Sequence, residues 1–150
     1  MTLSSVEVPR QLFIAGSWLD AADGARFAVE NPANREVIAH VADGDVGDAR
    51  RACAAAADAL PTWRRTLPRV RAEILRSAFE AMREHIDTLA DLIVIENGKP
   101  RAEAVAEVHY AAEFFRWFAE EAVRAPGYLS TAPATGRRIL ELAEPVGVSL

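Results

Sequence analysis

The segment between Pro100 and about Arg124 places the strongest constraint on what this chain can fold into, because it reads as one long helix that is apolar around most of its circumference. Its first apolar stripe comprises Val105, Val108, Ala112, Phe115 and Ala119, and its second comprises Tyr110, Phe114, Trp117 and Phe118. A helix with two such stripes must be covered on several sides. We therefore expect a mostly helical segment whose cover comes partly from outside the chain's four predicted helices and few short strands.

A first helix is predicted from Asp45, a good N-cap, to about Leu60, and Pro61 is expected to end it. Its expected inner face is built from residues that permit close packing, namely Ala49, Cys53, Ala56 and Leu60. Cys53 is the only cysteine and has no histidine or asparagine partner nearby in the sequence. We therefore interpret it as a small buried residue rather than a nucleophile.

Two more helices are predicted before the long one. Pro68 suits the first turn of the second helix. The stripe of that helix is Val70, Ile74, Ala78 and Met82, widened by Leu75, Phe79 and Ile86. Asp87 is expected to cap the third helix, and Asn97-Gly98 to end it in the left-handed conformation. The arginines within 64–71 precede several glutamates on the same stretch, which predicts a solvated helix face rather than an anion site.

Short strands and turns are predicted for the first 41 residues. The expected strands are residues 12–14, 18–19, 26–30 and 37–41. Gly16 supplies the turn of a hairpin between the first two. Asp23-Gly24 is a second expected turn, and a third is expected at Asn31-Pro32, because the residue before a proline is pushed out of the helical region.

The C-terminal part of the sequence predicts further strand structure. Residues 130–136 read as a polar loop, 138–144 as a strand, and 146–150 as the beginning of a new strand with alternating apolar residues. An exposed apolar strand end favours aggregation. We therefore expect Leu150 to be a truncation point rather than a natural end.

Composition excludes several classes of protein. Hydrophobic residues make up 51% of the 150 residues and charged residues 26%, which is typical of a soluble globular protein. No apolar run approaches the roughly 20 residues of a membrane span, and no secretory signal is evident. The net charge of -5 argues against nucleic-acid binding. We expect a cytoplasmic protein with neither a nucleic-acid nor a membrane partner.

The sequence offers no recognisable catalytic centre. The three histidines, His40, His85 and His109, lie far apart and lack the spacing of a helical di-iron site. No GxGxxG motif is present. Gly98-Lys99 resembles the end of a P-loop, but Pro100 replaces the required Ser or Thr. We therefore assign no catalytic and no cofactor-binding residue.

Four segments, in order, do resemble motifs of one family. They are 13–18 (FIAGSW), 27–32 (FAVENP), 95–100 (IENGKP) and 144–148 (EPVGV). Together they resemble the N-terminal part of the aldehyde dehydrogenase superfamily over about residues 11–150. Residues 110–122 look most similar to the succinate-semialdehyde dehydrogenase branch.

The resemblance implies an α/β fold, of which this segment is mostly helical with an N-terminal β-hairpin region and a C-terminal strand. It implies a flexible N-terminus at 1–10 and an incomplete N-terminal portion of the cofactor-binding domain at 11–150. Residues 137–150 would lead through strands of the oligomerisation or bridging region. When complete, such an enzyme is expected to be a homo-oligomer.

Members of the superfamily oxidise an aldehyde to an acid with NAD or NADP, by way of a cysteine thiolate and a glutamate-activated water. The motifs that supply these groups are not among the 150 residues, and Cys53 does not occupy the nucleophile's motif. The resemblance therefore implies that this segment alone is inactive and holds no nicotinamide cofactor. Its substrate, in the complete enzyme, would be a small aldehyde.

The resemblance implies two peripheral sites. Tyr110, Phe114 and Trp117 map to a wall of the substrate tunnel, although core packing against a missing domain is an alternative role. Val29, Glu30 and Glu96 map to a monovalent-cation site, and carbonyl oxygens with a carboxylate suit a hard cation.

A second hypothesis belongs to another functional class. The chain could be a stand-alone helical binding module without catalysis, whose partner site is the surface around Phe114, Trp117 and Phe118.

Overall fold

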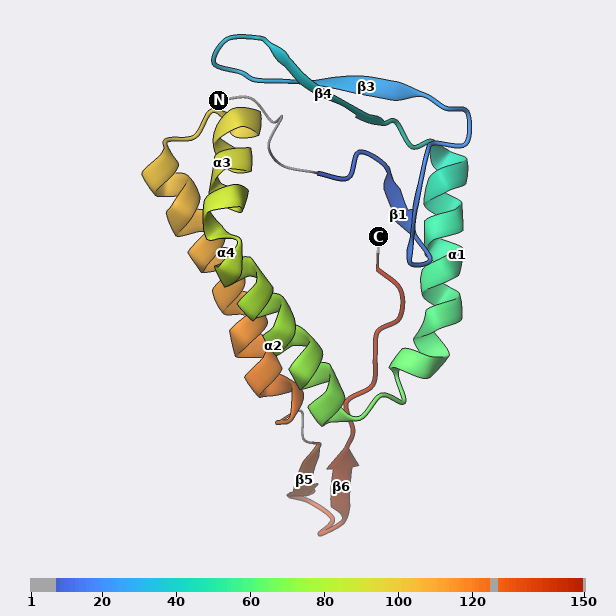
Figure 1. Ribbon diagram of the computed structural model, residues 1–150. Coiled ribbons are helices and arrows are strands. Elements are labelled where there is room, and N and C mark those ends of the chain that lie inside the picture. The colour runs from blue at the N-terminus through green and yellow to red at the C-terminus, as the bar shows by residue number, and fades with distance from the viewer. Residues whose placement is uncertain (1–7, 125–126, 150) are drawn as a thin grey trace.

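The computed structural model describes residues 8–124 and 127–149 (Figure 1). Strand pairs precede and follow a run of four helices, so the chain mixes helix and strand as predicted. Most of the predicted flexible segment 1–10 lies outside the described residues, as do Pro126 and Leu150. No described helix is both long enough and apolar enough to span a membrane.

Two antiparallel hairpins form the N-terminal part; the first was predicted as a hairpin, and the second as two strands with a turn between them. Strand β1 (Leu12–Ile14) pairs with β2 (Ser17–Leu19), and β3 (Arg26–Glu30) pairs with β4 (Val37–Ala42). The first turn uses Ala15 and Gly16, which both have positive φ, as tight hairpin turns require.

Helix α1 (Val46–Trp63) begins at the predicted cap, Asp45, but does not stop at Pro61. A proline removes only its own backbone donor, and Pro61 lies in the last turn of the helix. The N–H of Arg64 still donates to the carbonyl of Leu60 at 2.9 Å, so the helix closes one further turn.

The predicted inner face of α1 is not a covered face in the structure. Ala49 and Ala56 are exposed, and Cys53 and Leu60 are half-buried. Strand β1 contacts only the first half of the helix. Among the described residues, no member of this predicted inner face is fully buried.

Helices α2 (Pro68–Glu84) and α3 (Ile86–Asn97) both pack along α4 (Arg101–Ala122), which forms the longest element (Figure 1). The core between α3 and α4 is centred on Ala90, Ala104 and Val108. Small side chains at these positions allow the helices to approach closely. The first predicted stripe of α4 faces this layer, with Val108, Ala112 and Ala119 buried.

Besides the end of α1, the main disagreement with the predicted helix boundaries lies at the start of α3. Pro68 occupies the first turn of α2, and Gly98 ends α3 in the left-handed conformation at φ +71°. The N-cap position of α3 is His85 rather than Asp87, and it makes no side-chain capping bond. Asp87 lies in the first turn and accepts a hydrogen bond from Arg101 at 2.6 Å instead.

The C-terminal hairpin pairs β5 (Tyr128–Thr131) with β6 (Arg138–Glu141). The loop predicted at 130–136 was therefore wrong at its first two residues, and the strand predicted at 138–144 ends at Glu141. Residues 142–149 form no strand although their apolar residues alternate. A strand needs a partner to satisfy its backbone, and no described strand lies alongside this segment.

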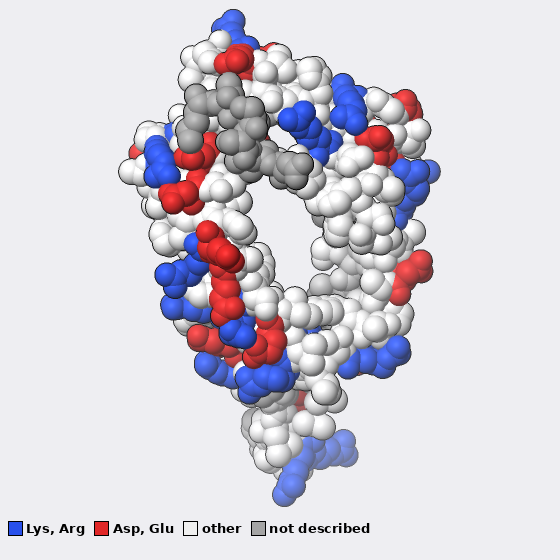
Figure 2. Space-filling model, in the orientation of Figure 1, with Lys and Arg blue, Asp and Glu red and all other residues white. Residues whose placement is uncertain are grey.

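The elements are arranged around an opening (Figure 1). Helix α1 lies on one side of it, α2 with α4 on the other, and the β3–β4 hairpin spans one end. Residues 142–149 run from the β5–β6 hairpin into this space. Figure 2 shows that the opening passes between the two sides and that its walls are mainly uncharged.

Candidate functional site

Three aromatic residues predicted to line a substrate tunnel lie together on one side of α4. Tyr110, Phe114 and Trp117 follow one another at helical intervals of four and three residues. The rings of Tyr110 and Phe114 meet edge to face with their centroids 5.0 Å apart. Tyr110 is 68% exposed and Trp117 63% exposed, so the described residues leave this surface largely open. With Phe118, these residues are called the aromatic face below.

Ion pairs join the N-terminal end of α4, the helix that carries the aromatic face, to α3. Arg101 donates to Asp87 at 2.6 Å and to Asp91 at 3.0 Å, which joins the first turn of α4 to α3. These hydrogen bonds, led by that of Asp87, raise the pKa of Arg101. Lys99 forms a second ion pair with Glu107 across the same junction. The direction of α4 is thus fixed where the chain leaves α3.

The segments of the predicted cation site also meet in the structure. Val29 and Glu30 end strand β3, and Glu96 lies in the last turn of α3. A Cβ placed on Gly98 would lie 3.0 Å from Cγ of Pro32, so the turn after β3 contacts the end of α3. The pairing of β3 with β4 shifts register between Val29 and Glu30. A bulge of this kind re-aims backbone groups at a strand end.

The chemistry of these residues suits a monovalent cation better than a transition metal. Glu30 and Glu96 are both exposed carboxylates, and backbone carbonyls would have to complete the shell. Within residues 8–124 and 127–149, no group of three or more His, Cys, Asp or Glu side chains is arranged to hold a metal ion. The structure brings the two segments together.

An apolar groove that the sequence did not predict runs beside Glu96. It has a volume of about 440 Å³ and lies where α3, α4 and the end of α2 meet. Its lining includes Met82, Leu92, Ile93 and Ala111, with Glu96 and Glu107 among its polar groups. Glu107 is paired with Lys99, whereas Glu96, the other carboxylate of this groove, forms no ion pair with a residue of 8–124 or 127–149. No sequence motif signals the groove, because three separate helices form it.

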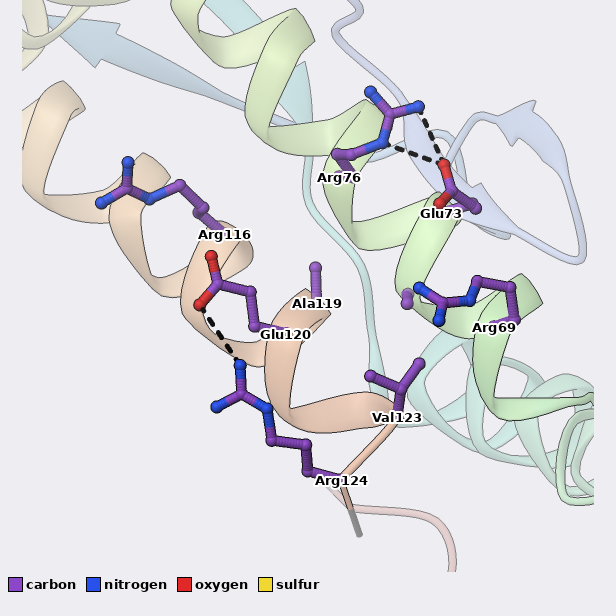
Figure 3. Close-up of a pocket in the computed structure, with 9 residues that line it drawn as sticks. Arg69, Glu73, Arg76, Arg116, Ala119, Glu120, Val123 and Arg124 are labelled. Atoms are coloured by element: carbon purple, nitrogen blue, oxygen red, sulfur yellow. Dashed lines mark hydrogen bonds and ion pairs between the residues drawn. The ribbon is translucent and has the colours of Figure 1, made fainter.

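A second pocket, of about 280 Å³, lies between α2 and α4 (Figure 3). Its lining includes the arginines Arg69, Arg76, Arg116 and Arg124. Most of these charges are neutralised by neighbouring carboxylates on the same helix. Arg76 lies 2.8 Å from Glu73, whose hydrogen bond raises the pKa of Arg76.

The ion pairs of this pocket join residues three or four positions apart on the same helix, and they neutralise most of the arginines rather than leaving an anion site. Arg116 pairs with Glu113 at 2.6 Å, and Arg124 pairs with Glu121 at 3.2 Å. Of the arginine cluster predicted as a solvated face, Arg64, Arg65 and Arg69 are exposed, whereas Arg71 is half-buried and donates to the carbonyl of Thr66 at 2.8 Å.

Asp48 is the buried charge that sequence reasoning missed. Its carboxylate accepts hydrogen bonds from the backbone N–H of Ala22 at 3.2 Å and of Asp45 at 3.1 Å, and it pairs with Arg51. Burial raises the pKa of Asp48, but these hydrogen bonds and the arginine together outweigh burial and lower it. Asp45 and Asp48 form a reciprocal capping box. The sequence indicates this capping box by two acidic residues three positions apart, Asp45 and Asp48.

The N-terminus of α1 is consequently unsuited to a cofactor phosphate. It follows strand β4 after Gly44, in the order that phosphate-binding turns use. However, the carboxylates of Asp45 and Asp48 accept the N–H groups of Asp48 and Asp45, respectively, and place negative charge there. The residues at this helix start therefore do not fit a nicotinamide dinucleotide.

The remaining nucleophilic and basic candidates are dispersed. Cys53 is half-buried on α1, while His40, His85 and His109 are exposed on β4, at the start of α3 and on α4. The structure does not bring them together into a site.

Comparison with known proteins decides the family. The model of the aldehyde dehydrogenase family matches residues 18–150. This chain belongs to the aldehyde dehydrogenase family. The resemblance found in the four sequence segments is thereby confirmed.

The relatives include semialdehyde dehydrogenases. Glutarate-semialdehyde dehydrogenase of Pseudomonas putida is 44% identical over 140 residues, which are 93% of this chain and 29% of that protein. The NADP(+) succinate-semialdehyde dehydrogenase GabD of Escherichia coli is 42% identical over the same shares. The crystal structure of succinate-semialdehyde dehydrogenase from Burkholderia pseudomallei has a TM-score of 0.84 and 37% identity, covering 91% of this chain and 29% of that one.

The chain thus spans less than a third of the length of these aldehyde dehydrogenases. The similarity to their solved structures confirms the predicted aldehyde dehydrogenase-like α/β fold for this segment.

Proposed function

We propose that this chain is the N-terminal portion of an NAD(P)-dependent dehydrogenase that oxidises a semialdehyde, such as succinate semialdehyde, to the dicarboxylic acid. The match to the aldehyde dehydrogenase family over 18–150 is the observation that supports this proposal most strongly. Relatives at 42% and 44% identity are named for succinate and glutarate semialdehydes, whose carbon chains differ by one methylene. These names favour the dehydrogenase over the stand-alone binding module.

In this proposal the chain supplies scaffold and substrate wall rather than the reacting groups. The nicotinamide cofactor supplies the hydride acceptor when it is bound by the complete enzyme. Tyr110, Phe114 and Trp117 present an apolar surface that can contact the hydrocarbon part of an aldehyde and exclude water from it. The cation site at Val29, Glu30 and Glu96 would hold the β3 turn against α3.

The remaining expectations follow from the same proposal. Residues 11–150 would belong to the cofactor-binding domain, and 137–150 would lead through the bridging strands. The complete enzyme would be a cytoplasmic homo-oligomer that acts on a small aldehyde and binds neither nucleic acid nor membrane.

The activity is tested by comparing the chain alone with a fusion to the part of the P. putida enzyme that it does not match. We expect no reduction of NAD or NADP by the 150-residue chain with succinate semialdehyde. We expect the fusion to reduce one of the two cofactors with succinate or glutarate semialdehyde. A soluble, folded fusion that oxidises neither substrate would contradict the proposal.

The substrate wall is tested in that fusion by truncating one aromatic residue at a time. Trp117→Ala and Phe114→Ala are expected to raise KM for the semialdehyde by about tenfold, which corresponds to loss of about 1.4 kcal/mol of apolar contact. His109→Ala is the matched control, since His109 is exposed on the same helix. Equal effects on kcat and KM from all three variants would indicate a merely structural role.

The cation site is tested by replacing Glu96 with glutamine. We expect potassium to raise the melting temperature of the fusion, and Glu96→Gln to abolish that dependence. Glu103→Gln removes an exposed carboxylate from the next helix and should leave the potassium effect intact. Potassium-independent melting of the unaltered fusion would rule out the site.

A further inference from the structure

The groove beside Glu96 has an apolar floor that three helices build. The half-buried side chains of this floor are Met82 of α2, Leu92 and Ile93 of α3, and Ala111 of α4. The volume of the groove, about 440 Å³, lies within the range of roughly 300–1,000 Å³ that small-molecule sites occupy. The floor can therefore cover a short hydrocarbon chain and remove it from water.

The polar end of the groove is acidic. Glu96 lies in the last turn of α3, and Glu107 of α4 lines the same groove. Glu107 is paired with Lys99, but Glu96 forms no ion pair with a residue of 8–124 or 127–149. Of the described residues that line the groove, none is an arginine, a lysine or a histidine. The groove therefore presents a carboxylate that can pair with a cation from outside the chain.

The end of α3 adds to this negative charge. Helix α3 ends at Asn97, which lines the groove next to Glu96. The last carbonyl groups of a helix have no partner within it and carry the negative end of the helix dipole. The last turn of α3 contains no basic side chain that would offset this charge. Backbone and side chain thus favour a cation at the same end of the groove.

The pocket between α2 and α4 has a different electrostatic character (Figure 3). Its lining includes four arginines and two glutamates. The two glutamates, Glu73 and Glu120, already pair with arginines of their own helices. A cation in that pocket would meet positive charge and occupied carboxylates, so of the two pockets the groove beside Glu96 is the one that suits a cation.

We propose that the groove beside Glu96 binds a primary alkylammonium ion, with the ammonium group at Glu96 and the alkyl chain along the floor. A primary ammonium group donates several hydrogen bonds, which suits carboxylate and carbonyl oxygens. Its alkyl chain covers apolar surface that a metal ion would leave in water. This inference rests on the cation site of the proposed function and deepens it, because it names a class of organic ligand for the same carboxylate.

The ligand is distinct from the substrate of the proposed reaction. The semialdehyde of a dicarboxylic acid carries a carboxylate at neutral pH, which Glu96 and Glu107 would repel. A bound alkylammonium ion would instead bridge the end of α3 and the part of α4 around Ala111. It would stabilise the junction of these helices, because it binds only the folded chain in which the groove exists.

Binding is measured by isothermal titration calorimetry with ethylammonium, butylammonium and hexylammonium chloride. The lining residues all belong to the 150-residue chain, so the titrations use this chain, with its helix content checked by circular dichroism. We expect the affinity to rise about two- to fourfold for each added methylene, because full burial of a methylene corresponds to about fourfold. Hexanol has the same alkyl chain without the charge and should bind at least about tenfold more weakly than hexylammonium.

The ammonium end is located by a pair of matched variants. Glu96→Gln keeps the size of the side chain but removes its charge, and it should weaken hexylammonium binding at least about tenfold. Glu103→Gln removes an exposed carboxylate outside the groove and should change the affinity by less than about twofold.

The alkyl chain is located by altering the floor. Ala111→Leu places a larger side chain in the groove and should abolish the gain in affinity from ethylammonium to hexylammonium. Ala106→Leu enlarges an exposed position of the same helix outside the groove and should keep that gain. Leu92→Asn, on α3, makes the floor more polar at similar size and should reduce the gain, so the conclusion does not depend on the folding of one variant.

The titrations are repeated in the fusion described above, where the groove belongs to the complete enzyme. Equal affinity for the three ammonium ions, equal effects of Glu96→Gln and Glu103→Gln, or absence of binding to the fusion would overturn the proposal. Binding of hexylammonium that depends on Glu96 supports the groove even if the fusion oxidises no semialdehyde, a result that would count against the proposed activity alone. A melting temperature that potassium raises, without any binding of hexylammonium, would support the cation site and overturn the organic ligand.

Discussion

The helical layer α2–α4 and the single helix α1 have similar proportions of apolar residues, but only the layer buries apolar residues completely. In the layer, the chain covers its own small residues, and Ala90 and Ala104 have no exposed surface. Helix α1 has one buried residue, and that residue is the charged Asp48. Apolar periodicity therefore identifies a face that needs cover but does not say whether the same chain supplies it.

The difference between the two regions is one of partners rather than of helix-forming strength. Helix α1 has the better start, since a capping box closes its first turn, whereas α3 has no side-chain cap. Yet α3 is held by α4 on one side and by the Arg101 ion pairs at its first turns. We conclude that packing determines which helix belongs to the core.

The largest effect is expected from charging the core of the layer. Val108→Asp buries a carboxylate where the side chain is 3% exposed and should destabilise the chain by about 3 kcal/mol or more. Val70→Asp, the same substitution at 47% exposure, should cost less than about 1 kcal/mol in the isolated chain. Urea unfolding monitored by circular dichroism gives the free energy of unfolding of both variants. Equal losses would contradict the distinction between covered and uncovered faces.

A smaller loss is expected from enlarging a residue in the close contact of α3 with α4. Ala104→Leu adds volume where no exposed surface remains and should cost about 1–3 kcal/mol. Ala106→Leu, at an exposed position of the same helix, should change the free energy of unfolding by no more than about 0.5 kcal/mol. A stabilising Ala104→Leu would reveal an unfilled space in the core.

The capped and uncapped helix starts should differ by about 1 kcal/mol. Asp45→Ala removes the side-chain acceptor of the Asp48 N–H, which lies at 2.8 Å, and should cost roughly that amount. His85→Ala alters a cap position that makes no side-chain bond and should be nearly neutral. Hydrogen exchange of the backbone amides in the first turn of α1 and of α3 measures the effect of each substitution at its own helix start.

The smallest effect concerns acid stability. Because the folded state lowers the pKa of Asp48, the unfolded chain binds more protons at acid pH. Its contribution is therefore complete above the unfolded carboxyl value of about 3.9 and is lost as the pH falls through the lower folded value. Asp48→Asn should give a shallower loss of urea resistance between about pH 5 and pH 3 than the unaltered chain shows.

Asp58→Asn provides the control for the acid experiment. It removes one carboxylate from an exposed position of the same helix and should leave the pH dependence close to that of the unaltered chain. An unchanged dependence in Asp48→Asn would show that the buried capping carboxylate does not govern acid stability.

Local rules were sufficient for most of the fold. Asp45, Pro68 and Gly98 mark helix ends through their own backbone chemistry, so the sequence located them correctly. The errors arose where a neighbour decides the outcome. Asp87 is drawn away from capping by Arg101, and residues 142–144 lose their predicted strand because no described strand pairs with them.

The candidate site was only partly predictable for the same reason. The spacing of Tyr110, Phe114 and Trp117 places them on one side of a helix, and the structure keeps them there. The contact between Pro32 and Gly98 joins residues far apart in the sequence, so no local pattern could have located it. The groove beside Glu96 is assembled from three helices and left no signature in any one of them.

The order of elements along the chain has a consequence for biosynthesis. Helices α2, α3 and α4 are consecutive, so their layer can assemble on the ribosome as soon as α4 has emerged. Helix α1 is translated before them, and two residues of its predicted inner face, Ala49 and Ala56, are still exposed beside the completed layer. This part of α1 is therefore accessible to other molecules before, during and after assembly of the layer.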